Sequence, residues 1–393
     1  MKIALDAKPL FSRRTGIGRY IHQMLKELTR LDTDNEYFLC GVLGAMHKGR
    51  ISGDVFQKLG QRFKIPFPFR KIVRIATELY IPRGMRKVGA RLFWGTNYFG
   101  VFGRDFKTVI NIHDMAHARY PQHAHPVMGK HLTGKLRDHA HKAHGILTGS
   151  HHAKKEIVEL LNVPEEKIRV VYHGVEDCFR PVTDTKVLHN IRKKYSLPEK
   201  FLLFVGMIEP RKNIVGLLEA FAGLCKDARF EHGLAIVGPK GWGFQEIFQK
   251  VRDLGLARRV VFTGYAPEED LPALYNLADV FVCPSFYEGF GFPILEAMAC
   301  GTPVIASAVS SLPEIGGDAP LYMDPQNTDE IVRSIKRVLE EDGLRNDMRQ
   351  RGLARAQKFS WEAAARQTIQ LWEEASKGLP EASISPNASW RAS

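Results

Sequence analysis

The sequence has little of what a secreted or membrane-spanning protein needs. Its 393 residues include only five cysteines, with no C-x-x-C pair, so neither a disulfide framework nor a zinc site is indicated. No apolar run reaches about 18 residues, the length that a spanning helix requires. Asp6 and Lys8 interrupt the start of the chain, where a signal peptide needs an unbroken apolar stretch. We therefore expect reduced thiols and a cytoplasmic location.

Acidic residues are too few to balance the basic ones. Lysine and arginine number 56 against 43 aspartates and glutamates, which gives a formal net charge of +13. The excess is concentrated in residues 62–107, where basic residues are interspersed with apolar ones. Glu78 and Asp105 are the only acidic residues in this stretch. These basic residues are Arg62, Lys64, Arg70, Lys71, Arg74, Arg83, Arg86, Lys87, Arg91, Arg104 and Lys107.

Such a basic and apolar stretch suits an anionic partner. Phosphate head groups at the inner face of the cell membrane, or a lipid-linked substrate, fit this composition. A solvated face above an ordinary core helix fits it as well. Nucleic acid is a weaker alternative, because it needs basic and aromatic side chains on an exposed sheet or groove, and the predicted strands are too apolar for exposure.

Metal-binding patterns are also scarce. Many histidines lie between His113 and His173, but no H-x-x-x-H pair is accompanied by the carboxylates that a ligand set needs. The one D-x-D triplet, Asp32-Thr33-Asp34, lies in a polar stretch after the first predicted helix, away from the strand ends. We interpret it as a turn and expect no bound metal and no cofactor.

Short β-rich runs alternate with amphipathic helical patterns along the whole chain. The runs are apolar on both faces, as in parallel strands covered by helices, so an α/β fold with doubly wound sheets is predicted. The clearest helix has apolar residues at i, i+3, i+4 and i+7 from Ile17 to Leu31. The expected strands are 3–6, 37–42, 92–95, 108–113, 145–149 and 168–172 in the first half, and 201–205, 234–237, 260–263, 280–283 and 304–306 in the second.

The pattern divides the chain into two domains. We expect an N-terminal Rossmann-like domain at 1–180, a polar linker at 181–200 and a C-terminal Rossmann-like domain at 201–358. A helix at 359–377 follows, and the small, polar tail at 378–393 is expected to be disordered. Because doubly wound sheets bind ligands at the carboxyl ends of their strands, the site is expected in the cleft between the two domains.

The strongest motif follows the predicted strand 280–283. A glycine loop carries Glu288, Gly289 and Gly291, and a helix then begins near Pro293, a favoured first helical position for proline. Helix N-termini attract phosphate, and carboxylates such as Glu288 and Glu296 accept hydrogen bonds from sugar hydroxyls. A sugar nucleotide offers both groups. The alternative is that Glu296 only complements the helix dipole and Glu288 is a solvated loop residue.

Three further motifs lie at predicted strand ends. Arg211 and Lys212 follow the strand 201–205 and suit a diphosphate, although a pair at a helix start can also be a surface feature. Gly16 and Gly18 form a glycine turn without the third glycine of a dinucleotide fingerprint, which makes it a weak signal alone. The pair His113-Asp114 follows another strand, and its place at the cleft edge favours function over a structural role.

Together these residues resemble the retaining glycosyltransferases of the GT-B fold, family 4 (group 1), and most closely the bacterial mannosyltransferases of surface polysaccharide synthesis. The resemblance rests on Glu288-x7-Glu296, the Glu-Pro-Arg-Lys segment 209–212, the Gly16–Gly18 loop and the His113-Asp114 pair. The segments 262–265 and 296–304 are also typical. The resemblance covers nearly the whole chain and is strongest from 201 to 325.

The resemblance implies roles for these residues. Glu296 would hold the ribose hydroxyls, and Glu288 would hold the donor hexose together with the backbone of Phe290 and Gly291. Arg211 and Lys212 would neutralise the diphosphate, which the amides of Gly16 and Gly18 would approach from the other domain. His113 would lie against the transferred sugar, Gly264 and Tyr265 would contact the base, and Leu295 belongs to the same donor-binding segment. The catalytic set would be Glu288, His113, Lys212 and Arg211. The last helix, at 359–377, would cross back to the N-terminal domain.

One position departs from the family pattern. Many members have arginine after the glycine at 206, whereas this chain has Met207. Either Arg211 takes over the role of the missing arginine in addition to its own, or a basic residue of the N-terminal domain such as Arg13 or Arg14 assists.

The resemblance also implies the reaction. The donor would be GDP-mannose, with UDP-sugars as alternatives, and the acceptor a glycan or lipid-linked oligosaccharide. A GT-B epimerase, a phosphorylase and a non-catalytic sugar-nucleotide-binding protein remain alternatives. The donor base and sugar, the acceptor, the linkage and the oligomeric state are not readable from the sequence.

Overall fold

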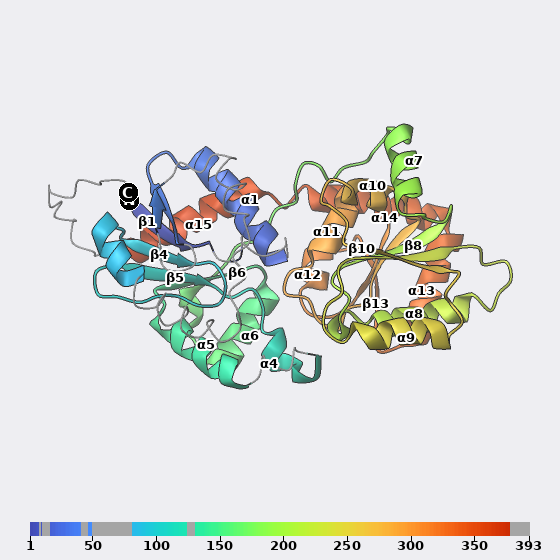
Figure 1. The fold of residues 1–393 in the computed structure, drawn as a ribbon, viewed down its shortest axis with the longest axis horizontal. Helices are drawn as coiled ribbons and strands as arrows, with labels where there is room; N and C mark the ends of the chain where they lie inside the picture. The colour runs from blue at the N-terminus through green and yellow to red at the C-terminus, as the bar shows by residue number, and fades with distance from the viewer. Residues whose placement is uncertain (8, 10–15, 41–45, 49–80, 124–129, 378–393) are drawn as a thin grey trace.

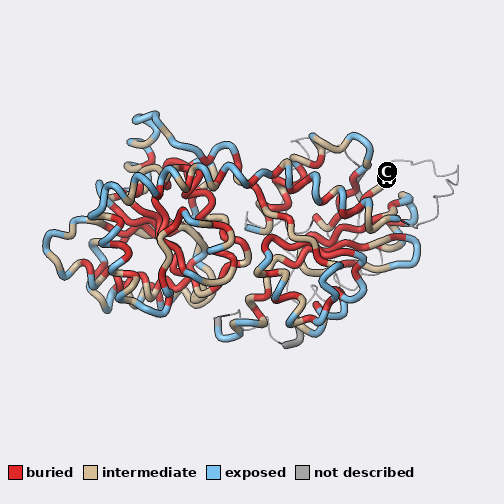
Figure 2. Tube along the Cα trace, turned by 180° about the vertical axis from the view of Figure 1, so that it is seen from behind, coloured by how far each residue is buried: buried red, intermediate tan, exposed pale blue. Residues whose placement is uncertain are grey.

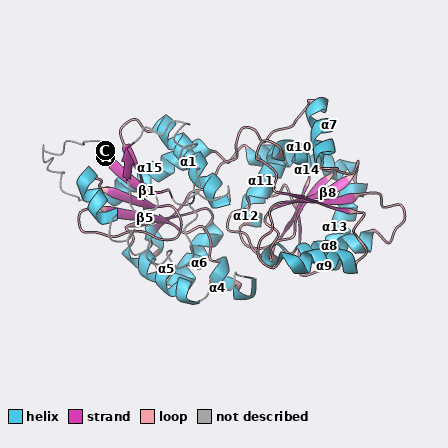
Figure 3. Ribbon diagram, in the orientation of Figure 1, coloured by secondary structure: helices cyan, strands magenta, loops and turns pink. Residues whose placement is uncertain are grey.

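The computed structural model describes residues 1–7, 9, 16–40, 46–48, 81–123 and 130–377. They form two lobes that lie side by side (Figure 1). In each lobe a central sheet has helices on both faces (Figure 3), and its strands are the most deeply buried part of the trace (Figure 2). The α/β class and the two facing doubly wound domains expected from the sequence are confirmed.

The first lobe is built on a seven-stranded sheet of order β3-β2-β1-β4-β5-β6-β7, in which only the β2–β3 pair is antiparallel. Its strands are β1 (Lys2–Asp6), β2 (Glu36–Cys40), β3 (Met46–Lys48), β4 (Leu92–Gly95), β5 (Lys107–Asn111), β6 (Gly145–Thr148) and β7 (Ile168–Val170). Helices α1 (Gly16–Leu31) and α15 (Trp361–Ser376) share one apolar cluster with the sheet, and α5 (Lys130–Lys142) and α6 (His151–Leu161) share another. The short elements are α4 (Ala116–Arg119), η3 (Pro121–His123) and η4 (Glu165–Lys167).

The second lobe has a six-stranded parallel sheet of order β10-β9-β8-β11-β12-β13. Its strands are β8 (Phe201–Val205), β9 (Gly233–Val237), β10 (Val260–Gly264), β11 (Val280–Cys283), β12 (Val304–Ser307) and β13 (Leu321–Met323). On one face lie α7 (Thr185–Lys194), α10 (Leu271–Leu277), α11 (Phe292–Ala299) and α12 (Leu312–Gly316). On the other lie α8 (Ile214–Leu224), α9 (Phe244–Asp253) and α13 (Thr328–Glu340), and the remaining elements are η5 (Pro210–Lys212) and α14 (Asp342–Ala356).

The strand order reverses direction at one place in each sheet, between β1 and β4 and between β8 and β11. At such a reversal the loops that leave the two neighbouring strands run to opposite sides, which opens a crevice at the carboxyl edge. The loops after β8 and β11 contain the Arg211-Lys212 and Glu288 motifs. The topology therefore places these motifs next to each other.

The structure adds details that the sequence pattern did not predict. The range 181–200, expected to be a polar linker, contains α7, which packs against α10 of the second lobe. Strands β3 and β13, of three residues each, were not among the expected strands. The last helix, α15, packs against α1, β5 and β6 of the first lobe, the domain to which the family resemblance implied that it would cross back. The expected tail 378–393 lies outside the described residues.

Candidate functional site

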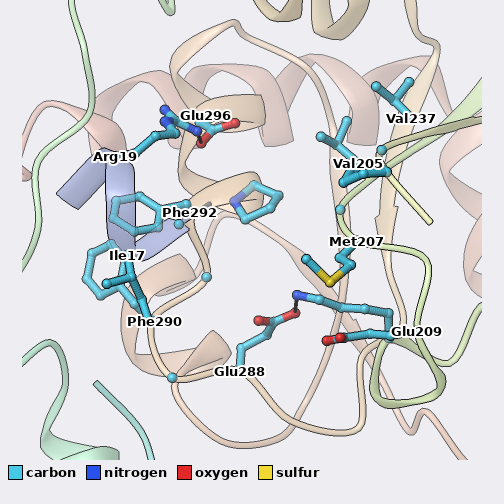
Figure 4. Close-up of a pocket in the computed structure, with 18 of the residues that line it drawn as sticks. Ile17, Arg19, Val205, Met207, Glu209, Val237, Glu288, Phe290, Phe292 and Glu296 are labelled. Carbon is cyan, nitrogen blue, oxygen red and sulfur yellow. Dashed lines mark hydrogen bonds and ion pairs between the residues drawn. The ribbon is translucent and has the colours of Figure 1, made fainter. Parts of the chain in front are cut away.

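A cavity of about 580 Å³ lies between the carboxyl edges of the two sheets. Both lobes contribute to its wall, and Figure 4 shows Glu288, Glu296, Arg19 and Met207 around it. The wall includes these residues predicted from the sequence: Gly16, His113, Arg211, Lys212, Tyr265, Glu288, Phe290, Gly291 and Glu296. The two motifs on which the sequence prediction depends therefore open onto one shared space.

Glu288 lies in the loop between β11 and α11, and its carboxylate is buried among cations. Oε1 accepts hydrogen bonds from Lys212 Nζ at 2.6 Å and from Ser285 Oγ at 2.6 Å, and Arg211 Nη1 lies 3.3 Å from Oε2. The backbone N–H of Glu288 donates to Ser310 Oγ at 2.9 Å. Burial alone would raise the pKa of Glu288, but Lys212 and Arg211 outweigh it and hold the pKa at about 2. The side chain is therefore a carboxylate at neutral pH.

Arg211 connects the two loops at the cavity floor. Its Nη1 donates to the carbonyl of Tyr287 at 2.6 Å, and its Nη2 forms an ion pair with Glu209 at 2.7 Å. Burial would lower the pKa of Arg211, but the carboxylates of Glu288, Glu209 and Asp114 raise it. The guanidinium therefore stays charged.

The start of α11 is shaped by a glycine and a serine. Gly291 has φ +104°, a left-handed conformation that favours glycine, and a Cβ there would lie 2.9 Å from Leu312 Cδ2. Ser311 Oγ lies within hydrogen-bond distance of the carbonyls of Glu288, at 2.8 Å, and Phe290, at 2.9 Å. These contacts tie the loop to Ser311, the residue before α12.

Glu296 lies in α11, buried to 2% exposure, and both of its oxygens have partners. Oε1 is 2.6 Å from Arg19 Nη1 of α1, and Oε2 accepts a hydrogen bond from Tyr275 at 2.8 Å. Figure 4 shows Arg19 and Glu296 pointing toward each other. No role was predicted for Arg19 from the sequence. The helpers that were predicted are the basic residues Arg13 and Arg14 of the same domain, and both lie outside the described residues.

Arg19 forms ion pairs with three carboxylates. Besides Glu296 it contacts Glu176 at 2.8 Å and Glu268 at 3.2 Å. Burial and the charge of Glu296 raise the pKa of Glu176, Arg19 opposes them, and the result is a pKa of about 6. One cation among three carboxylates, of which Glu176 and Glu296 are buried, leaves excess negative charge, which can be relieved by ligand hydroxyls that donate hydrogen bonds.

His113 contributes a neutral imidazole to the wall. Its Nε2 lies 2.9 Å from the carbonyl of Thr96; since a carbonyl only accepts, Nε2 is the donor. Burial lowers the pKa of His113 more than Thr96 and Asp114 raise it. The adjacent Asp114, which also lines the cavity, accepts a hydrogen bond from the backbone N–H of Ala116 at 3.0 Å.

A second histidine of the wall was missed. His173 is buried to 4% exposure, and its ring stacks on Trp361 at 5.9 Å and on Phe292 at 5.3 Å between ring centroids. Burial, and then His113, lowers its pKa well below the ordinary value. Its position just after β7, on the same sheet edge as His113, was the available signal.

Three predicted residues lie off the cavity wall. Leu295 is fully buried in the apolar cluster beneath α11, and Gly18 is buried in α1. Gly264 ends β10 with φ +70°, and its carbonyl accepts from the N–H of Gly238 at 2.8 Å. Beside it Tyr265 is 45% exposed and does line the cavity.

The described residues contain no group of three or more His, Cys, Asp or Glu that could hold a metal ion. The Asp32 carboxylate accepts hydrogen bonds from the backbone N–H groups of Asp34 and Asn35, so the triplet at 32–34 forms a turn. Within the same described residues, no helix is long and apolar enough to cross a membrane.

Residues 14–177 match the family model for Glycosyltransferase Family 4, and residues 189–355 match that for Glycosyl transferases group 1. The chain is 33% identical over 380 residues to O-antigen chain mannosyltransferase B of Escherichia coli. The alignment covers 95% of this chain and 100% of the relative.

Among solved structures, sucrose-phosphate synthase from Thermosynechococcus elongatus is similar with a TM-score of 0.77 at 23% identity, over 95% of this chain and 98% of that one. Anabaena HepE in complex with UDP-glucose has a TM-score of 0.72 at 17% identity, over 95% and 100%. Both likenesses show the fold. This chain therefore belongs to the family 4 (group 1) glycosyltransferases of the GT-B fold and is a hexosyltransferase.

Proposed function

We propose that the protein transfers mannose from GDP-mannose, with retention of anomeric configuration, to a glycan or lipid-linked acceptor in the synthesis of a cell-surface polysaccharide. The E. coli relative, named an O-antigen chain mannosyltransferase, supports the sugar and the pathway. The observation that carries the proposal is that two buried carboxylates and the Arg211-Lys212 pair open onto one cavity.

The donor is proposed to lie across this cavity. Glu296 accepts hydrogen bonds from the ribose hydroxyls, and the wall near Tyr265 takes the base. Arg211 and Lys212 meet the diphosphate, and the N-terminus of α1 at Gly16 faces it from the other lobe. Glu288, with the backbone of Phe290 and Gly291, holds the hexose against His113. Gly18, Gly264 and Leu295 support these positions from behind the wall.

The proposed reaction is attack on the face that the leaving group occupies. The acceptor oxygen forms a bond to the anomeric carbon, the bond from that carbon to the phosphate oxygen breaks, and the acceptor proton passes to the departing phosphate oxygen. A Glu288 pKa of about 2 makes this carboxylate a weak base. We therefore assign Glu288 to positioning the sugar, and not to covalent attack.

The charge of the departing diphosphate is proposed to be met by protein groups without a metal ion. Arg211 and Lys212 stay in the cavity wall, and preorganised cations of this kind stabilise developing charge strongly. A chelator test addresses this point. We expect turnover to persist in excess EDTA, and loss of turnover that Mg²⁺ or Mn²⁺ restores would contradict it.

Donor turnover is the direct test of the function. The purified protein is incubated with GDP-mannose or UDP-glucose, with and without a lipid-linked acceptor, and released GDP or UDP is quantified. We expect GDP release that depends on the acceptor, and an α-linked product by NMR. Release from UDP-glucose alone would overturn the donor assignment, and a β-linked product would overturn retention.

We also propose that the protein is cytoplasmic and docks at the inner face of the cell membrane through residues 62–107. Of this stretch, 62–80 lie outside the described residues. Residues 81–88 are helical, with Ile81 and Met85 buried and Arg83, Arg86 and Lys87 exposed. Co-sedimentation with vesicles tests the contact: binding to anionic but not to zwitterionic vesicles, weakened by salt, is expected. Equal binding to both, or binding to neither, would contradict it.

A further inference from the structure

One side chain of the Glu288 loop leaves its own lobe and enters the other. Tyr287 is 1% exposed, and its hydroxyl donates to Glu156 Oε2 of α6 at 2.6 Å. The same hydroxyl accepts the backbone N–H of Met115 at 3.2 Å. Tyr287 follows β11 of the second lobe, whereas Met115 and Glu156 belong to the first. The contact therefore exists only when the two lobes meet.

The acceptor in the first lobe is a buried carboxylate held in place. Glu156 is 2% exposed, and Arg119 Nε donates to its Oε1 at 2.9 Å, while His152 Nε2 lies 3.4 Å from the same oxygen. Burial would raise the pKa of Glu156, but its bonds with His152, Tyr287 and Arg119 lower it. The carboxylate is thus charged when the lobes meet, and Arg119 of the first lobe helps to orient it.

The other side of the loop is held as well. Ser150 Oγ, at the start of α6, donates to the carbonyl of Gly289 at 2.9 Å. A Cβ at Gly289 would lie 2.7 Å from Asp114 Cβ and 2.8 Å from the carbonyl of His113. The first lobe therefore contacts the residues on both sides of Glu288, namely Tyr287 and Gly289. Gly289 packs against the backbone of His113.

Glu288 is tied to these contacts through the chain and through Arg211. Arg211 Nη1 bonds the carbonyl of Tyr287, 2.6 Å away, and lies 3.3 Å from the Glu288 carboxylate. Separation of the lobes breaks the bonds of Tyr287 and Gly289 and leaves Glu156 without its tyrosine donor. The position of Glu288 relative to His113 is therefore set by the closed arrangement.

We propose that Tyr287 is a positioning residue whose hydroxyl, bound to Glu156 and Met115, couples closure of the two lobes to the placement of Glu288 opposite His113. The proposal rests on the sugar-binding role proposed above for Glu288. Tyr287 touches neither the donor nor the acceptor in this role and acts through the loop.

The test is Tyr287→Phe, which removes the hydroxyl and keeps the ring, with Glu156→Gln and the double variant. The matched control is Tyr195→Phe, which removes a tyrosine–carboxylate bond to Asp270 within the second lobe. We expect kcat with GDP-mannose to fall about 10- to 100-fold in Tyr287→Phe, with donor KM changed less than about threefold. The double variant should be no slower than Tyr287→Phe alone.

Small-angle scattering separates this role from simple stabilisation. With and without GDP, Tyr287→Phe should have a larger radius of gyration than the wild-type protein, and Tyr195→Phe should not. Wild-type kcat and dimensions in Tyr287→Phe, or additive losses in the double variant, would overturn the proposal. No turnover by the wild-type protein counts against the proposed function, whereas the scattering comparison without ligand still tests the coupling.

Discussion

Lys212 and Glu288 form a buried ion pair, and we propose a different role for each of its members. Both side chains are nearly excluded from water, and Nζ lies 2.6 Å from Oε1. In a buried pair, the loss of one member leaves the other charge without a partner, and this costs more than the pair contributes. Substitutions at either residue therefore combine a structural cost with a functional one. Kinetic constants separate the two effects better than activity alone does.

Two substitutions distinguish donor binding from transition-state stabilisation. Glu296→Ala removes the proposed ribose acceptor and should raise donor KM about tenfold with a smaller effect on kcat. Lys212→Ala removes the cation that is proposed to meet the leaving diphosphate and should lower kcat about 100-fold. Steady-state kinetics with varied GDP-mannose measure both constants.

Lys250→Ala is the control for this pair, because Lys250 forms an ion pair with Glu219 away from the cavity. It should leave both constants within about twofold of the wild-type values. If Glu296→Ala and Lys212→Ala behave like the control, the roles assigned to Glu296 and Lys212 are wrong.

At the scale of elements, α15 shows how the end of the described chain completes the first lobe. Trp372 is fully buried, with its ring 5.0 Å from that of Trp94 and 6.2 Å from that of Tyr37 between centroids. Ser360 caps the helix by accepting the N–H of Ala363. The helix α15, which starts beside the second lobe, therefore contributes side chains to the hydrophobic core of the first lobe.

Trp372→Ala should destabilise the protein by about 3–5 kcal/mol, because it removes a large side chain and leaves a cavity. Gln367, exposed on the same helix, is the control, and Gln367→Ala should change stability by less than about 0.5 kcal/mol. Urea unfolding followed by far-UV circular dichroism measures both. A Trp372→Ala midpoint equal to that of the control would show that α15 contributes little to the first lobe.

At the scale of the whole molecule, several contacts between the lobes are polar or charged, beside aromatic ones such as His173 on Phe292. Glu314 of α12 accepts the first backbone N–H groups of α6, from His151 at 2.7 Å and His152 at 3.0 Å. Arg19 of α1 reaches Glu268 and Glu296 of the second lobe. Polar contacts of this kind can be exchanged for water at modest cost, which suits an enzyme whose lobes must admit and release a substrate.

The Arg19 cluster makes stability depend on pH. The folded-state pKa of Glu176, about 6, lies above its ordinary value of 4.5. The stability that this group contributes to the fold is therefore fully present below pH 4.5 and is lost as pH rises through 6. Arg19→Gln removes the only opposing charge among these four residues. We expect the variant to lose more thermal stability relative to wild type at pH 8 than at pH 5, where Glu176 is protonated. Scanning calorimetry at both pH values measures this, and an equal loss at both would contradict it.

The lack of a side chain at Gly289 allows the two lobes to approach closely at this point. Gly289→Ala places a methyl group against Asp114 and the His113 backbone, at distances that real Cβ atoms do not show. We expect kcat to fall at least tenfold and the radius of gyration to grow. Gly343→Ala, where nothing lies within 4 Å of the new Cβ, is the control and should leave both unchanged. An active, compact Gly289→Ala would show that the lobes can meet elsewhere.

The sequence by itself determined the elements and the motifs at their ends. Strands such as 201–205 and 280–283 were predicted with the bounds that the structure has, because apolar runs and glycine loops are local properties of the chain. Strands β3 and β13 and helix α7 were not predicted, since tertiary contacts and not periodicity sustain them.

Only the tertiary structure decided which charges meet. Glu288 and Lys212 are 76 residues apart, Tyr287 and Glu156 are 131 apart, and Arg19 and Glu296 are 277 apart. No local pattern encodes such pairs, because they depend on where two sheets reverse their strand order and how the lobes face each other. The same long-range packing buries these side chains, and burial together with the partner sets the charge state of Glu288 and Glu176.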